Sequence, residues 1–166
     1  KLWIDNKWVD YVAPQLYWEY GHRLAAYEIL LNWWENNCRD RHLYIGLGLY
    51  RMTDAKVGSP YYGPNQILRQ IDGIRDQRVL GSIMYSLVSF SKIGSGLSNQ
   101  LQTPEYFGNI AIPPTMNWLD NEAPYKPMVK MTLSSLEQNP ILRYTSTSSQ
   151  KETVKYLIYR FDEGQP

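Results

Sequence analysis

One carboxylate lies where the chain could use it for acid–base or nucleophilic chemistry. Glu19 follows the aromatic pair Tyr17-Trp18 and precedes the chain-breaking Gly21. A glutamate can act as a general acid, a base or a nucleophile when a second carboxylate lies about 5 to 9.5 Å away. The alternatives are a solvated loop glutamate or an acceptor for a sugar hydroxyl. Glu19 is therefore the candidate catalytic residue of this sequence.

Four neighbours of Glu19 are of types that line sugar-binding clefts. Tyr17 and Trp18 could form a platform for a pyranose ring, because each has an apolar face and a polar tip; the alternative is core packing at a strand end. Gln15 shares the side of Tyr17 on an extended strand, because side chains repeat every two residues. His22 could donate a hydrogen bond to a sugar hydroxyl or pack at a helix N-terminus. All four are candidate substrate-binding residues.

Three later residues complete the candidate set. Tyr50 and Arg51 end the second apolar run, and Tyr85 lies in the third. Arg51 could clamp a carboxylate, with a structural ion pair as the alternative. Asp54 follows in a polar loop and is expected to be solvated. The set therefore draws on three separate runs of the chain.

Metal and nucleotide chemistry lack the residues they need. The two histidines, His22 and His42, and the single cysteine, Cys38, have no zinc-ligand spacing, so no metal is expected. Cys38 has no base nearby in the sequence and is interpreted as inert. The glycines of Gly46-x-Gly48 lack the third glycine of a dinucleotide fingerprint and suit a tightly packed interior. No cofactor is expected.

Composition narrows the class of protein. The 166 residues have a formal net charge of +1 and no basic block, which argues against a nucleic-acid partner. No apolar run reaches the roughly 18 residues of a membrane span. The aromatic residues comprise 14 Tyr and 6 Trp against 3 Phe. Such amphipathic rings suit cores, protein interfaces and sugar-binding clefts alike.

Three strand-then-helix units must position the candidate residues. The expected strands are 8–18, 42–50 and 79–90, and the expected helices are 23–37, 65–78 and 99–107. Pro14 is awkward in a central strand, because proline removes a donor from the ladder. Repeated units of this kind predict a parallel sheet with right-handed crossovers. In a parallel barrel the active site lies where strands run into the following loops, which is where the candidate residues fall.

The count of units predicts a partial barrel. A closed (β/α)8 barrel needs eight units and about 250 residues, and three units cannot close. We therefore expect an α/β fold made of the last three units of such a barrel over residues 1–112, with further chain before Lys1.

The remainder of the chain has a different pattern. Residues 113–126 are rich in proline and are expected to form an extended linker packed by Trp118. Three strand-like runs follow over 127–166, at 128–133, 141–147 and 154–161, with turn residues between them. They predict an antiparallel β module, the start of a sandwich that would need about seven strands.

These residues resemble a known family. The segment DYVAPQLYWEYGHRLAAYEILLNWW resembles the sixth strand and helix of the glycosyl hydrolase-like 10 barrels, which are similar to glycoside hydrolase family 10. LYIGLGLYRM resembles their seventh strand, and GSIMYSLVSF with PPTMNWLD their eighth unit and exit linker. The rest resembles the fibronectin-type-III-like module that often follows. The resemblance implies an exported protein that acts on poly- or oligosaccharides, with a cleft lined by Gln15, Tyr17, Trp18, Tyr50, Arg51 and Tyr85.

One departure from the family limits this expectation. Classical family 10 enzymes have a nucleophilic glutamate at the end of strand seven, where this chain reads Leu49-Tyr50-Arg51-Met52. The resemblance implies that the main catalytic acids lie upstream of Lys1 and that this piece is inactive alone. The expected function is a glycoside hydrolase for which this chain supplies cleft walls. The alternatives are a non-catalytic carbohydrate-binding barrel and an interaction fragment that self-associates through open sheet edges.

Overall fold

The chain folds as two units, Lys1–Thr115 and Met116–Pro166. The computed structural model describes residues 1–93, 95–123, 126–134, 140–145 and 158. The first unit contains a small sheet with its helices, and the second contains a hairpin, so each is described by itself. In the described residues no helix combines the length and apolar character needed to cross a membrane.

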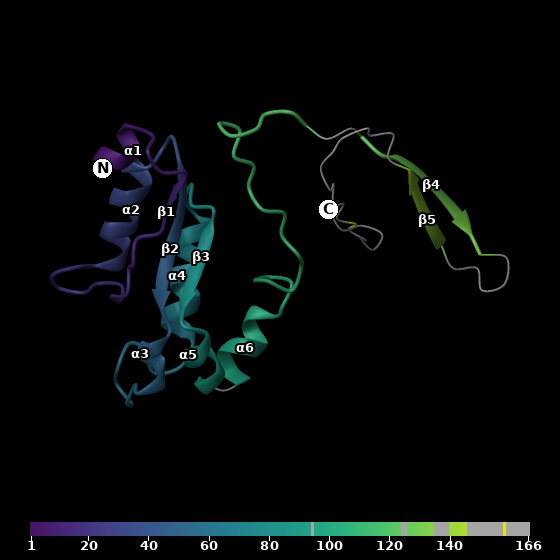
Figure 1. Cartoon of the computed structure of the whole chain (residues 1–166). Helices are drawn as coiled ribbons and strands as arrows, with labels where there is room; N and C mark the ends of the chain where they lie inside the picture. Colours follow the sequence, from purple (N-terminus) through teal and green to yellow (C-terminus); the bar gives the residue numbers. More distant parts are fainter. Residues whose placement is uncertain (94, 124–125, 135–139, 146–157, 159–166) are drawn as a thin grey trace. The chain divides into compact units, whose positions relative to one another are not determined.

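A three-stranded parallel sheet forms the centre of the first unit (Figure 1). Its order is β1 (Tyr11–Val12), β2 (His42–Gly48) and β3 (Gly81–Tyr85), so strands adjacent in sequence are adjacent in space. An isolated parallel bridge between Gln15 and Gly46 continues the β1 side. Because all strands run the same way, their C-terminal ends meet at one edge.

The two faces of the sheet differ in composition because side chains alternate along a strand. On one face of β2, Leu43, Ile45 and Leu47 are fully buried and belong to the hydrophobic core, as does Leu49 directly after the strand. On the other face β2 presents Tyr44, Gly46 and Gly48, and the ladder pairs both glycines with residues of β3, Ile83 and Tyr85. Ile83 and Tyr85 are exposed, so the first face carries the core and the second is open in the described chain.

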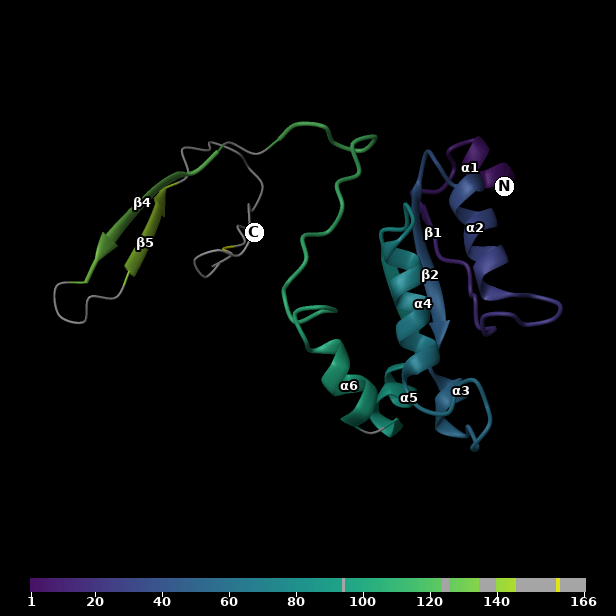
Figure 2. The same cartoon turned by 180° about the vertical axis from the view of Figure 1, so that it is seen from behind.

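The long helices cover the core face of the sheet. Helices α2 (Tyr27–Asn37) and α4 (Asn65–Arg75) contact each other and both contact β2, so they pack on the same side. Figure 2 shows α4 in front of β2, running lengthwise along the strands, and α4 also contacts β3. Their buried positions follow the helical period: Tyr27 and Leu31 in α2, and Ile67, Ile71 and Ile74 in α4.

Four short helices complete the first unit, namely α1 (Leu2–Asp5), α3 (Tyr50–Thr53), α5 (Leu87–Lys92) and α6 (Ser95–Leu101). Helices α3 and α5 contact each other, and Figure 1 shows them at the arrowhead end of the strands. The end of the sheet that the sequence assigned to the site is therefore bordered by α3 and α5.

Three strand predictions were too long. The strand predicted over 42–50 ends at Gly48, and Tyr50 begins helix α3. The strand predicted over 79–90 ends at Tyr85, because Ser86 caps helix α5 by accepting a hydrogen bond from the Ser89 amide. The strand predicted over 8–18 is regular only at Tyr11–Val12, consistent with the missing donor of Pro14. The segments 8–18 and 79–90 still bring Tyr17 and Tyr85 to the C-terminal edge.

Helix predictions also shift at their ends. The helix predicted over 23–37 is α2, which begins at Tyr27 instead of residue 23. Leu24 lies exposed before it. The helix predicted over 65–78 begins at Asn65 as expected, with Pro64 at its N-cap, and ends earlier, at Arg75. Helix α6 begins at Ser95, ahead of the expected start at 99.

The second unit contains an antiparallel hairpin of β4 (Met128–Leu133) and β5 (Pro140–Thr145). The pairing places Val129, Met131 and Leu133 opposite Tyr144, Leu142 and Pro140. These residues share one face, because directly opposite residues of a ladder point the same way. The third predicted strand, 154–161, lies outside the described residues except for Ile158.

Candidate functional site

Three tyrosines, one from each strand end, gather at the C-terminal edge of the sheet. We call Tyr17, Tyr50 and Tyr85 the tyrosine triad. The rings of Tyr17 and Tyr85 are nearly parallel, with centroids 6.2 Å apart. Tyr50 stands edge-on to both, at 5.7 Å from Tyr17 and 6.4 Å from Tyr85. Because Tyr50 and Tyr85 are exposed, the triad presents ring surface to solvent.

Two glycines of β2 make room for the first ring of the triad. A Cβ placed on Gly48 would lie 3.0 Å from Cγ of Tyr17 and 3.2 Å from its Cβ. A Cβ on Gly46 would lie 3.2 Å from the carbonyl oxygen of Pro14. The ring of Tyr17 and the backbone before it therefore lie directly on β2.

Adding one methyl group at Gly48 tests this packing. The change Gly48→Ala is expected to displace Tyr17 and to lower the free energy of unfolding by about 1–3 kcal/mol, because the contact falls at the base of the ring. Chemical denaturation measures the change. The control is Gly96→Ala in α6, where a new Cβ meets nothing within 4 Å. A stable Gly48→Ala protein with unchanged tyrosine absorbance would contradict the packing.

Gln15, Trp18 and His22 lie around the triad without joining it. Gln15 is exposed and pairs with Gly46 through the β-bridge. The ring of Trp18 lies against His22, with centroids 6.4 Å apart. His22 Nδ1 accepts hydrogen bonds from the amides of Leu24 and Ala25. Nδ1 therefore closes the turn before α2, and only Nε2 remains to face a ligand.

Glu19 and Arg51 form an ion pair beside the triad. Arg51 Nη2 lies 3.6 Å from Glu19 Oε2, and their side chains are 32% and 21% exposed. The guanidinium also lies 4.6 Å from the centroid of Tyr61, a cation–π contact. In the described chain the Glu19 carboxylate thus meets a cation, and Asp54, the other candidate acid, is exposed. The pair matches the structural alternative that the sequence left open for Arg51.

A layer of buried polar groups holds the backbone under the candidate residues. Tyr61 Oη donates to the carbonyl of Tyr17 at 2.7 Å, and Gln70 Nε2 donates to the carbonyl of Trp18 at 2.8 Å. The next carbonyl, that of Glu19, accepts from the amide of Tyr27 at 3.2 Å. Three consecutive carbonyls are therefore bound by three different parts of the chain.

The sequence analysis missed Tyr61 and Gln70. Tyr61 is 2% exposed and Gln70 is completely buried. Burial raises the pKa of Tyr61 to about 12, although the nearby Arg51 guanidinium acts in the opposite direction. Burial also raises the pKa of Tyr17, with smaller contributions from Tyr50 and Tyr85. These phenols remain neutral near pH 7, so they act as hydrogen-bonding and stacking groups.

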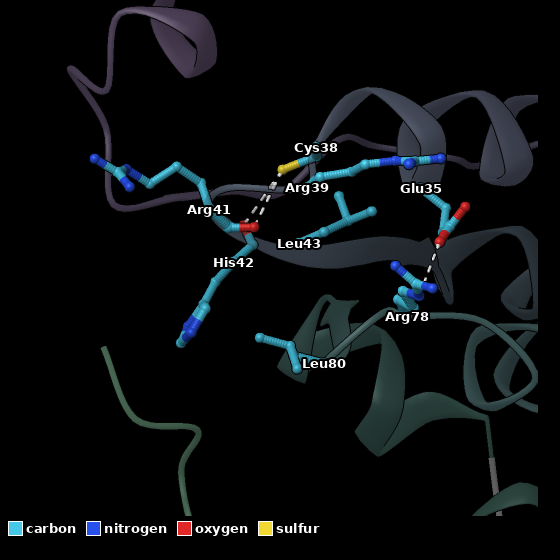
Figure 3. A pocket seen from close by; sticks show the side chains of 8 residues that line it. All are labelled: Glu35, Cys38, Arg39, Arg41, His42, Leu43, Arg78 and Leu80. Atoms are coloured by element: carbon cyan, nitrogen blue, oxygen red, sulfur yellow. Dashed lines mark hydrogen bonds and ion pairs between the residues drawn. The ribbon is translucent and has the colours of Figure 1, made fainter. Parts of the chain in front are cut away.

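A pocket lies away from the triad, at the N-terminal end of β2 (Figure 3). Its charged lining includes an ion pair of 3.9 Å between Glu35 and Arg78. Arg41 is drawn away from that pair, toward the carbonyl of Val9, to which its Nε donates. The Cys38 thiol is buried, and burial raises its pKa, which agrees with an inert cysteine. The side chains diverge, so the pocket does not resemble a converging site.

Among the residues that the structure describes, no group of three His, Cys, Asp or Glu side chains lies in a position to hold a metal ion. The candidate site therefore consists of aromatic rings, one ion pair and hydrogen-bonding groups.

The chain is similar to proteins named glycosyl hydrolases, and no family model matches it. The chain is 38% identical over 165 residues to a protein named glycosyl hydrolase YngK from Bacillus subtilis strain 168, a match covering 95% of this chain and 32% of YngK. It is 37% identical over 78 residues to glycosyl hydrolase DigH from Escherichia coli K12, covering 43% of this chain and 18% of DigH. The chain thus spans about a third of the length of YngK.

Proposed function

We propose that this chain forms one wall of the carbohydrate-binding cleft of a glycoside hydrolase. The observation that carries the proposal is the tyrosine triad, which gathers three aromatic rings at one edge of the sheet, with Tyr50 and Tyr85 exposed. Aromatic faces stack on the apolar faces of sugar rings. The relatives named glycosyl hydrolases support the same class of function.

The proposed fold is a segment of a (β/α)8 barrel. Sequential parallel strands with α2 and α4 on one face and an open second face support it. In this proposal the open face, with Tyr44 and Ile83, faces the barrel interior, and residues 127–166 start a fibronectin-type-III-like module. The carbohydrate-active protein is proposed to be exported, as the family resemblance implies.

Glu19 has a supporting role in the proposal. Its carboxylate is held by Arg51, and its pairing with a second carboxylate would depend on chain beyond the described residues. We therefore assign the main catalytic acids to another part of the full-length protein. The same ion pair favours one second candidate, a carbohydrate-binding barrel without catalysis, because it engages the one candidate catalytic acid beside the triad.

Removing one ring of the triad tests the proposed function. The change Tyr85→Ala is expected to weaken glycan binding about tenfold, because stacking contributes about 0.5–1.5 kcal/mol beyond the area it buries. Calorimetry of the full-length protein and its variants with a panel of soluble oligosaccharides measures the dissociation constant, and a reducing-sugar assay on the same samples measures hydrolysis. Tyr62→Ala, which removes an exposed tyrosine outside the triad, is the matched control.

The outcomes separate the two candidates. Binding with release of reducing sugar supports the hydrolase, and binding without release supports the non-catalytic barrel. If Tyr85→Ala and Tyr62→Ala bind as the unchanged protein does, the triad is not the sugar-binding surface.

A further inference from the structure

The backbone of Tyr17 and Trp18 is held by two side chains that are almost completely buried, Tyr61 and Gln70. Tyr61 and Gln70 are buried on the core side of the segment, whereas Tyr17 and Trp18 belong to the proposed wall. The donors lie 44 and 52 residues away in sequence from the carbonyls they bind. Two distant elements therefore fix one short piece of backbone.

The carbonyls of Tyr17 and Trp18 need side-chain donors, because the backbone hydrogen bonds to β2 end before Tyr17. The last backbone bond between the two strands runs from the Leu16 amide to the Gly46 carbonyl. A buried carbonyl without a partner costs free energy comparable to a lost hydrogen bond. The phenol of Tyr61 and the amide of Gln70 take the place of the ladder for Tyr17 and Trp18.

The contacts of Tyr61 extend to the ion pair. The guanidinium of Arg51 lies on its ring at 4.6 Å and reaches Glu19 on the other side. One buried tyrosine thus touches the backbone of Tyr17 through its hydroxyl and the cation of the pair through its ring. A shift of Tyr61 would move both parts of the wall together.

We propose that Tyr61 and Gln70 are positioning residues that set the affinity of the aromatic wall for its glycan without contacting it. This inference rests on the proposed function and deepens it. It predicts that two side chains outside the cleft determine ligand affinity through the placement of Tyr17 and Trp18. A purely structural role would change stability and leave affinity unchanged.

The test uses Tyr61→Phe and Gln70→Met, which keep volume and remove one donor each. Each is expected to raise the dissociation constant for the best-bound oligosaccharide of the panel about tenfold, since small misplacements of a wall are costly. Amide exchange over residues 15–20, followed by mass spectrometry, is expected to speed up in both variants. If the full protein turns glycan over, KM is expected to rise more than kcat falls.

Two matched variants separate positioning from general loss of stability. Gln66→Met removes a buried amide one turn earlier in α4 whose Nε2 has no hydrogen-bond partner in the described chain. Tyr20→Phe removes a hydroxyl that donates to the carbonyl of Arg69 in α4, not to the wall. Both are expected to keep the affinity of the unchanged protein.

The inference is overturned if Tyr61→Phe and Gln70→Met bind as tightly as the unchanged protein, or if the two controls weaken binding equally. A protein that binds no oligosaccharide would overturn the proposed function instead. In that case the exchange experiment still decides the positioning role: unchanged exchange at 15–20 in both variants refutes it, and faster exchange confined to that segment supports it.

Discussion

Replacing Ile45 by alanine is expected to lower the free energy of unfolding of the first unit by about 2–5 kcal/mol. Ile45 is completely buried at the centre of β2, on the face covered by α2 and α4. The change removes three carbons and leaves a cavity among Leu31, Ile67 and the other core residues. Urea denaturation followed by tryptophan fluorescence measures the loss.

Ile83 provides the matched control for this change. It has the same side chain on the neighbouring strand, opposite Gly46, but it lies on the open face and is 47% exposed. Ile83→Ala is expected to cost less than about 1 kcal/mol, because little apolar area returns to water. An equal cost at both positions would mean that the open face is covered in solution, by further chain or by a second molecule.

The change Arg51→Gln is expected to have the second large effect, a loss of about 1–3 kcal/mol in stability. It leaves a Glu19 oxygen that is shielded from solvent without its cation, and an uncompensated buried charge is costly. It also removes the cation–π contact with Tyr61. Thermal and chemical denaturation of Arg51→Gln, Glu19→Gln and the double variant give the coupling energy of the pair.

An exposed ion pair serves as the control for the stability change of Arg51→Gln. Lys1 and Asp5 lie 3.1 Å apart in α1 with both side chains about half exposed. Lys1→Gln is expected to change stability by less than about 0.5 kcal/mol, as is usual for exposed pairs. If Arg51→Gln costs as little, the Glu19–Arg51 pair is a surface contact and does not hold the wall.

Periodicity predicted most elements of the first unit and misplaced those in continuous apolar runs. The run 79–90 has no alternation, so a strand and a strand followed by a helix fit it equally well. The side chain of Ser86 determines where the strand ends and the helix begins, because it caps α5. A serine inside an apolar run is a weak signal for such a boundary in the sequence. The hairpin was predicted more accurately, since turn residues bound its two strands and β4 begins and ends as expected.

The triad could be predicted because strand ends meet at one edge of a parallel sheet. Tyr17 and Tyr50 lie at the ends of expected strands and Tyr85 lies within the third, and the structure brings the three rings into contact. Tyr61 and Gln70 could not be predicted, because their importance lies in hydrogen bonds to backbone far away in sequence. Tyr61 sits in a polar loop, and Gln70 reads as a solvated helix residue until the fold buries it.

The alkylation rate of the buried Cys38 thiol can report local opening of the first unit. It is the single cysteine of the chain, and its thiol lies against the carbonyls of Arg41 and His42 at the start of β2 (Figure 3). The side chain is 6% exposed and lines the pocket of Figure 3, so we expect a thiol-specific reagent to react slowly with the closed form and faster as that region opens more often. Each variant described above could therefore be ranked by one chemical rate, without denaturant and without signal from the hairpin unit.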